Sequence, residues 1–148
     1  MPTRKKEGFS IIEVIVVIVM IGILAGVSFP FFSLIYTRNN IDAATQGVVR
    51  IIQQARINSE AMEADDTWGV KVQSGSVVLF KGSSYAARNT SYDQVLSISS
   101  NISFTGSTIT EIVFAKLTGL PITPGTFTLT LGTDVRNVIV NSKGMVSY

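Results

Sequence analysis

One acidic side chain, Glu13, lies at the start of a long uncharged stretch of the chain, shortly after Gly8. No residue from Val14 to Thr37 is charged. An unpaired carboxylate costs on the order of 2 to 3 kcal/mol at the centre of a lipid bilayer, and less near its surface. We therefore expect Glu13 either to lie at the boundary of the bilayer or to pair with a cation.

A break in the chain between Gly8 and Phe9 would supply such a cation. The new α-amine would begin an apolar helix, with Glu13 just over one helical turn away. In a neighbouring subunit displaced along a shared axis, that amine would meet the carboxylate as an intermolecular ion pair. The alternative is that Glu13 only marks a boundary, which leaves the apolar Ile11 and Ile12 before it unexplained.

The rest of the chain offers little for catalysis. It has no cysteine and no histidine, so thiol nucleophiles, disulfides and the commonest general base are excluded. Asp65 and Asp66 are adjacent and would point in different directions, and Asp134 is a single acid where calcium needs several oxygen ligands. We expect no enzymatic activity, no cofactor and no metal site.

The charge of the chain is concentrated near its N-terminus. There are 12 basic and 10 acidic residues, and the first eight positions hold three of the former and one of the latter. Without those positions nine of each remain, so net charge does not favour nucleic-acid binding, although local clusters stay open. Basic residues that flank an apolar segment predict a cytoplasmic N-terminus.

The uncharged segment from Val14 to Thr37 predicts a membrane span, because a helix of this length crosses a hydrocarbon layer of about 30 Å. An ordinary secretory signal cleaved within Ile23 to Ser28 is the alternative, but the apolar run continues beyond that point. Pro30 removes one backbone donor and is expected to interrupt and kink the helix.

A second helical pattern covers Arg38 to Ala64. Its apolar stripe is expected to pack on the sheet of the same chain. The members of this stripe are Ile41, Ala44, Val48, Ile51, Ile52, Ala55 and Met62.

From Trp68 onward the pattern alternates, as in strands with one buried face. A tight hairpin is expected at Gln73 to Ser76, and a loop from Lys81 to Tyr92. Strands are predicted at Trp68–Val72, Ser76–Phe80, Val95–Ser99, Asn101–Phe104, Ile109–Phe114, Thr126–Leu131 and Arg136–Val140. The fold class expected is α+β.

The stretch from Lys5 to Pro30, KKEGFSIIEVIVVIVMIGILAGVSFP, resembles the N-terminal signature of type IV pilins and of the pseudopilins of type II secretion. The resemblance implies cleavage between Gly8 and Phe9 by prepilin peptidase, N-methylation of Phe9, and assembly into a filament. Glu13 would carry register or charge neutralisation between subunits, and Pro30 occupies its expected place. Ser10 and Ile11 stand where threonine and leucine are usual.

Later segments resemble the GspH/FimT group of minor pseudopilins and minor pilins: QARINSEAM from Gln54, WGV from Trp68, IVFAKLTGLP from Ile112 and VNSKGMVSY from Val140. This resemblance implies a pilin-like antiparallel β-sandwich head packed on the long helix. Some members of the group bind DNA for natural transformation through a basic C-terminal region. Here Met145 follows Gly144, where an arginine is usual, which weakens that alternative.

Together these observations predict a leader peptide at 1–8, a transmembrane and assembly segment at 9–37, an amphipathic helix at 38–66 and a β-rich head at 67–148. We expect a structural subunit of a type IV pilus or a type II secretion pseudopilus, held in the cytoplasmic membrane by one span with its head outside. Its expected partners are other pilin or pseudopilin subunits, prepilin peptidase and the membrane.

Overall fold

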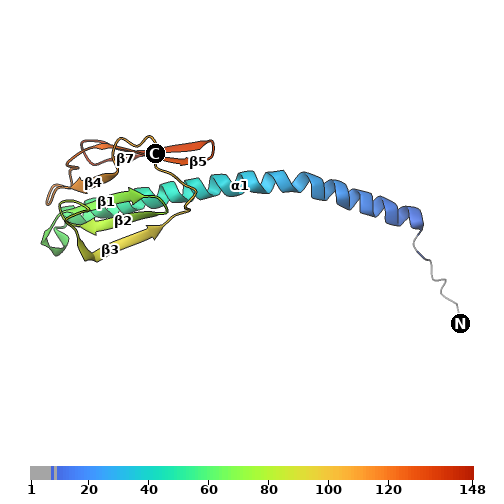
Figure 1. The fold of residues 1–148 in the computed structure, drawn as a ribbon, viewed down its shortest axis with the longest axis horizontal. Coiled ribbons are helices and arrows are strands. Elements are labelled where there is room, and N and C mark those ends of the chain that lie inside the picture. Colours follow the sequence, from blue (N-terminus) through green and yellow to red (C-terminus); the bar gives the residue numbers. More distant parts are fainter. Residues whose placement is uncertain (1–7, 9) are drawn as a thin grey trace. The chain divides into compact units, whose positions relative to one another are not determined.

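The computed structural model describes residue 8 and residues 10–148, and the side chains of residues 27–38 lie outside this description. The described chain is α+β, with one N-terminal helix followed by two antiparallel sheets (Figure 1). It divides into two compact units, Met1–Tyr36 and Thr37–Tyr148. The predicted fold class is confirmed at this level, and the four predicted segment boundaries stay predictions.

The helix α1 extends over Ile11–Glu60. It continues through Pro30 as one element, so the interruption predicted at this residue is wrong. A proline removes only one intrahelical donor, and the hydrogen bonds of the turns on either side keep the helix together.

The second half of α1 buries one stripe of side chains. Ile41, Val48, Ile52 and Ala55 are fully buried, in agreement with the predicted spacing of three and four residues. Beyond Ala55 the buried side chains are the polar Asn58 and Ser59. The sequence pattern instead predicts the apolar Met62 as the next member of the stripe.

The helix ends at Glu60, earlier than the predicted Ala64. A short 3₁₀ turn, η1 (Glu63–Asp65), follows, and Met62, Ala64 and Asp65 all have positive φ values of 52°, 54° and 59°. This turn brings Trp68, which is 1% exposed, into the core. Its backbone N–H donates to Ser59 Oγ at 2.9 Å, and its indole N–H donates to the Glu63 carbonyl at 2.9 Å.

The first sheet has four strands in the order β3-β2-β1-β4. The strands are β1 (Trp68–Gln73), β2 (Ser76–Lys81), β3 (Asn89–Ser97) and β4 (Glu111–Phe114). The predicted hairpin between β1 and β2 is confirmed, with Gly75 at φ 77°. Such a φ favours glycine because it has no Cβ.

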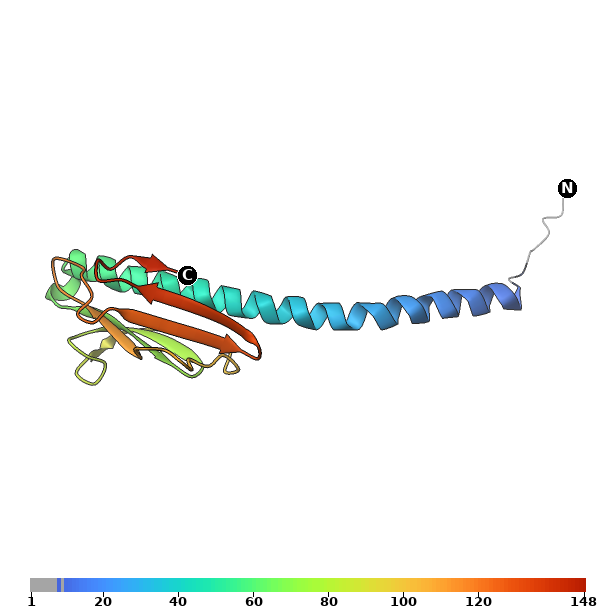
Figure 2. The same cartoon turned by 90° about the horizontal axis from the view of Figure 1, so that it is seen from above.

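The second sheet has the order β5-β6-β7. Its strands are β5 (Gly125–Leu131), β6 (Asp134–Val140) and β7 (Val146–Ser147). The predicted alternation in β5 is confirmed, because Phe127 and Leu129 are fully buried between half-buried threonines. Figure 2 shows the β5–β6 hairpin in orange and red along the later part of α1.

One buried core joins the helix and both sheets. Each large apolar side chain buried there contributes roughly 1.5 to 3 kcal/mol of transfer free energy. Its largest members are Trp68, Phe114, Phe127, Ile41, Ile52, Leu79, Ile102, Ile112 and Leu129.

Two predictions on the strands need correction, and one short strand, β7, was not predicted. Asn101–Phe104 is not a strand, since only Ser103 forms an isolated bridge, to Thr130. The expected loop from Lys81 to Tyr92 ends early, because β3 begins at Asn89. This first part of β3 is polar and exposed, so it carries no alternation. The short β7 has too few residues for any pattern.

Candidate functional site

The N-terminal residues that the sequence singles out lie at the start of α1. Gly8 and Ser10 are exposed and precede the first helical residue, Ile11. Phe9, the predicted site of methylation, lies outside the described residues. A Cβ added at Gly8 would meet no atom within 4 Å, so packing within the described chain does not require glycine there.

Glu13 lies in the first turn of α1 and is exposed. The Ser10 carbonyl accepts the backbone N–H of Glu13 at 3.0 Å and that of Val14 at 3.3 Å, which makes Ser10 the residue that flanks the helix start. A serine at this position followed three residues later by glutamate has the spacing of a capping box. The sequence analysis missed this relation, although the S-x-x-E spacing is readable in the chain.

The surface of α1 next to Glu13 is apolar and uncovered in the described chain. From Ile11 to Leu24 the large apolar side chains are between 46% and 82% exposed. Surfaces of this kind mark contact with another apolar partner. The predicted site residue Pro30 lies further along the same helix, and its side chain is outside the described set.

The predicted membrane span from Val14 to Thr37 extends beyond the side chains that the structure describes. Within the described residues, no helix has both the length and the hydropathy needed to cross a membrane.

Two adjacent acidic residues of the head, Asp65 and Asp66, are engaged in local contacts. Lys116 Nζ pairs with the Asp65 carboxylate and lies 3.4 Å from the Asp65 carbonyl. This hydrogen bond and the charge of Lys116 hold the pKa of Asp65 below its ordinary value. Asp66 Oδ1 instead accepts the N–H of Thr67 at 2.8 Å, so the adjacent acids serve different contacts, as predicted.

Asp134 begins β6, opposite Leu131. The part of the chain that the structure describes contains no group of three or more acidic side chains with the geometry of a metal site.

A local cluster of basic and aromatic residues lies on the four-stranded sheet and the connection after β2. The Arg88 guanidinium lies 3.8 Å from the Tyr85 ring centre, and Lys81 Nζ lies 4.7 Å from that of Tyr92. Arg88 also pairs with Asp93 at 2.8 Å, and this bond raises the pKa of the guanidinium above its ordinary value. The Arg88–Asp93 ion pair thus partly neutralises the charge of the cluster and ties the connection after β2 to β3.

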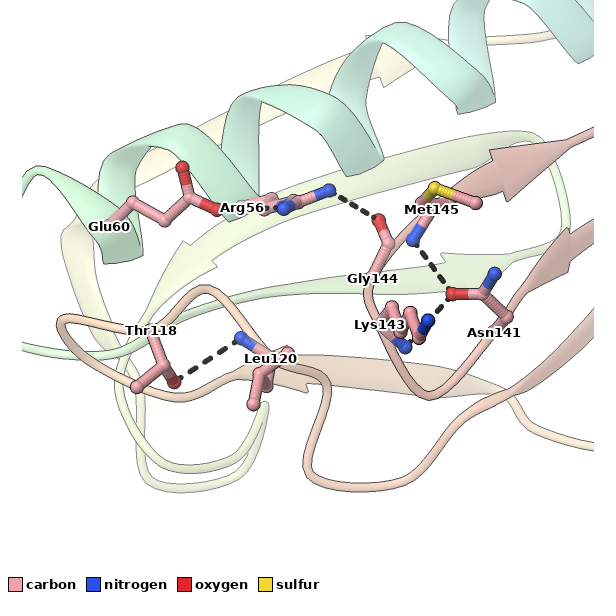
Figure 3. Close-up of polar contacts among 8 residues, drawn as sticks. All are labelled: Arg56, Glu60, Thr118, Leu120, Asn141, Lys143, Gly144 and Met145. Atoms are coloured by element: carbon pink, nitrogen blue, oxygen red, sulfur yellow. Dashed lines mark hydrogen bonds and ion pairs between the residues drawn. The ribbon is translucent and has the colours of Figure 1, made fainter.

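The loop after β6 is held from the end of α1 (Figure 3). Arg56 Nε pairs with Glu60 Oε1 at 2.8 Å, and its Nη1 donates to the Gly144 carbonyl at 3.1 Å. The Asn141 carboxamide oxygen accepts the N–H groups of Lys143 at 2.9 Å and Met145 at 3.0 Å. These hydrogen bonds hold residues 141–145 at the end of α1.

The comparisons with known proteins give one match. Residues 3–29 match the family model of the prokaryotic N-terminal methylation motif. No curated protein and no solved structure matches the chain. The matched residues include Gly8, Ser10 and Glu13, whose exposed positions at the start of α1 are described above. The chain therefore carries the N-terminal methylation motif that is characteristic of type IV pilin-like proteins.

Proposed function

We propose that the protein is a minor pilin or pseudopilin, a structural subunit of a type IV pilus or of a type II secretion pseudopilus, with a role in filament assembly, initiation or the filament tip. The observation that carries this proposal is the methylation motif over residues 3–29, together with the exposure of Gly8 and Ser10 before α1. A peptidase needs an accessible scissile bond, and the exposed Gly8 contributes the carbonyl side of the bond that we propose is cleaved.

The exposed apolar surface of α1 supports the assembly role. Side chains such as Ile11, at 82% exposed, gain free energy when lipid or another apolar helix covers them. In this proposal the segment is held in the cytoplasmic membrane before assembly and exchanges lipid for other subunits in the filament. The resemblance to the GspH/FimT group supports a β-sandwich arrangement of the two sheets in an outward-facing head.

Assembly is proposed as the whole function, without catalysis. The ionisable residues of the head support this, since Asp65, Asp93 and Glu60 each pair with a basic residue. Such pairs stabilise local structure and leave no free acid–base couple among them.

Processing tests the proposal directly. When the full chain is expressed with prepilin peptidase, intact-mass analysis should show loss of Met1–Gly8 and a gain of one methyl group. An N-terminus elsewhere, such as after Ala25, would favour an ordinary secretory signal and would contradict the proposal.

Gly8→Val provides the matched variant. The space around Gly8 is open, so the substitution creates no clash within the described chain, and any loss of cleavage arises at the peptidase. Gly22→Val is the control, because it is also surrounded by open space but lies away from the cleaved bond. Normal cleavage of Gly8→Val would argue against this peptide bond as the processing site.

A further inference from the structure

The backbone of the head is in unfavourable conformations at one place, where α1 ends. In the described chain the residues other than glycine with positive φ lie in two connections there. They are Met62, Ala64 and Asp65 in the turn after α1, at 52°, 54° and 59°, and Leu117 between β4 and β5, at 73°. Elsewhere in the described head such φ values belong to glycines, for example Gly75 and Gly132.

The two connections are held together through one buried residue. The Ser59 carbonyl accepts the N–H of Met62 at 3.3 Å and that of Leu117 at 3.0 Å, and Ser59 is fully buried. Within the second connection the Ala115 N–H donates to the Leu120 carbonyl at 2.8 Å. Leu120, labelled in Figure 3, also donates its own N–H to the Thr118 hydroxyl at 3.4 Å. These bonds fix the backbone from which Met62, Leu117 and Leu120 project.

The three side chains point to solvent. Leu117 is 64% exposed, Met62 43% and Leu120 44%. Glycine or asparagine would adopt the φ of Leu117 with less strain, and a leucine so exposed contributes little to the core of the head. Folding of the chain thus does not account for leucine at this position. Exposed apolar side chains on a strained backbone are typical of contact sites.

Acidic groups flank these side chains. In the described chain Glu60 pairs with Arg56 and Asp65 with Lys116, whereas the exposed Glu63 and the half-buried Asp66 form no ion pair. Lys81, whose charge also acts on Asp65, lies 4.7 Å from the Tyr92 ring centre. We call Met62, Leu117, Leu120, Glu63 and Asp66 the cap surface. It combines an apolar centre with two unpaired carboxylates.

The carboxylates of the cap surface exclude several kinds of partner. They repel the phosphates of nucleic acids and of anionic lipids. In a two-fold contact through the cap surface, the acids of one copy would face the same acids of the other.

A copy in the same orientation would present the other end of its head. The described charges there are the Asp42–Arg136 pair, at 2.9 Å, and the acidic Asp134, so this end is not basic either. A second copy of the chain therefore does not complement the cap surface.

We infer that the cap surface docks a different protein, through a surface that presents an apolar pocket bordered by lysine or arginine. Leu117 and Met62 enter the pocket, and the basic residues pair with Glu63 and Asp66. The backbone strain is useful here, because anchors that are fixed before binding lose little conformational freedom on binding. This inference concerns the head alone and goes beyond the proposed function.

Photo-crosslinking of the full chain in its natural host tests the inference. Leu117→p-benzoylphenylalanine should give an adduct with one different protein, and the crosslinked segment should contain lysine or arginine beside apolar residues. Val135→p-benzoylphenylalanine is the matched control, since Val135 is 48% exposed on β6. The adduct yield should be several-fold higher from position 117. A yield no higher than that of the control, or an adduct with a second copy, lipid or nucleic acid, would overturn the inference.

The charge of the partner is tested in the same chain. Glu63→Lys with Asp66→Asn should lower the adduct yield from position 117 several-fold, and asparagine keeps the oxygen that accepts the Thr67 N–H. Asp134→Lys is the control and should leave the yield unchanged. Equal yields from the acidic-site variant and the natural chain would contradict a basic partner.

Leu117→Asn separates docking from folding. With the crosslinker at position 62, this substitution should lower the adduct yield several-fold, while the denaturation midpoint of the head stays the same or rises. A lower midpoint would show that Leu117 stabilises the fold, and an unchanged yield would show that it is no anchor. The intact mass of the same samples reports cleavage after Gly8 separately, so failure of this inference is distinguishable from failure of the proposed function.

Discussion

At the scale of single residues, Glu13 occupies a position where two different contacts favour a carboxylate. It lies three residues after Ser10 at the start of α1, where a carboxylate interacts favourably with the free N–H groups and with the helix dipole. Pairing with the α-amine of another processed subunit is the second contact, which we propose. The two roles require different properties of the side chain, because capping needs an acceptor whereas pairing needs a charge.

Glu13→Gln separates these two roles. Glutamine also serves in a capping box but carries no charge. If the intermolecular pair operates, Glu13→Gln and Glu13→Ala should both leave membrane insertion intact and reduce incorporation into filaments, measured as the fraction of subunit in sheared filaments. Normal incorporation of Glu13→Gln would contradict the pairing hypothesis and assign Glu13 to helix capping.

Ser10→Ala is the matched variant for capping. If the Ser10 hydroxyl caps the helix, its loss should cost about 0.5 to 2 kcal/mol of helix stability and speed amide hydrogen exchange in the first turn of α1. Incorporation into filaments should change less than with Glu13→Gln. Unchanged exchange in the first turn would show that Ser10 does not cap the helix.

Gly144 and Gly132 offer a matched pair in the head. Both have positive φ, at 73° and 61°, but a Cβ at Gly144 would lie 2.9 Å from the Gly119 carbonyl oxygen, while one at Gly132 would meet nothing within 4 Å. Alanine should cost about 1 to 2 kcal/mol at either position through backbone strain. Gly144→Ala should cost about 1 to 3 kcal/mol more, because the loop must shift.

Chemical unfolding of the two variants provides the measurement. Trp68 is the single tryptophan and is 1% exposed, so its fluorescence reports on the head. Equal losses of unfolding free energy for the two variants would show that the short distance between a Cβ at position 144 and the Gly119 carbonyl oxygen costs no free energy.

At the scale of elements, the turn after α1 and the β4–β5 connection hold each other. The N–H of Leu117 donates to the Ser59 carbonyl at 3.0 Å, and Lys116 pairs with Asp65 in the turn. Asp65 and Leu117 have φ values of 59° and 73°, which non-glycine residues adopt only where their surroundings hold them. The two connections therefore position the start of β1 together.

Lys116→Ala should raise the pKa of Asp65 towards its ordinary value, because the hydrogen bond and the charge of Lys116 lower it. A carboxyl group whose pKa is lowered on folding contributes stability above its unfolded pKa, which is about 3.9, and loses that contribution as the pH falls through the folded pKa. Natural chain and variant should thus differ at neutral pH and converge in acid. Lys143→Ala is the control.

A carboxyl-detected NMR titration of Asp65 measures this effect. The pKa of Asp65 should rise in Lys116→Ala and stay low in Lys143→Ala. An unchanged value in Lys116→Ala would show that the ion pair is absent in solution.

At the scale of the whole molecule, the chain consists of two units that meet different physical demands. Residues Thr37–Tyr148 enclose one core that contains side chains from the helix and from both sheets. In the described part of Met1–Tyr36 the apolar side chains are exposed. A unit with its own core can fold alone, whereas exposed apolar side chains need an external partner.

The isolated unit Thr37–Tyr148 should therefore fold in one cooperative transition. Its circular dichroism should show mainly β structure with one helix, and Trp68 fluorescence should give the same midpoint of chemical denaturation as circular dichroism. Two separate transitions, or a mostly helical spectrum, would contradict a single shared core.

The sequence by itself determined the features that depend on local pattern. The methylation motif is a linear signal, and its family match agrees with the interpretation of Gly8, Phe9 and Glu13 as parts of a pilin-like N-terminus. The stripe from Ile41 to Ala55 and the alternation in β5 follow from the helical and strand periods, which act within a few residues. The hairpin at Gly75 likewise depends on a local backbone conformation.

Only the tertiary structure decided where these elements end and which strand edges the described residues cover. The helix stops at Glu60 because burial of Trp68 outweighs the helical preference of the next residues. The polar start of β3 becomes a strand because β2 supplies its hydrogen bonds, and Ser103 covers β5 through a single bridge. These outcomes depend on partners distant in sequence, and their free energy exists only once the core has brought the partners together.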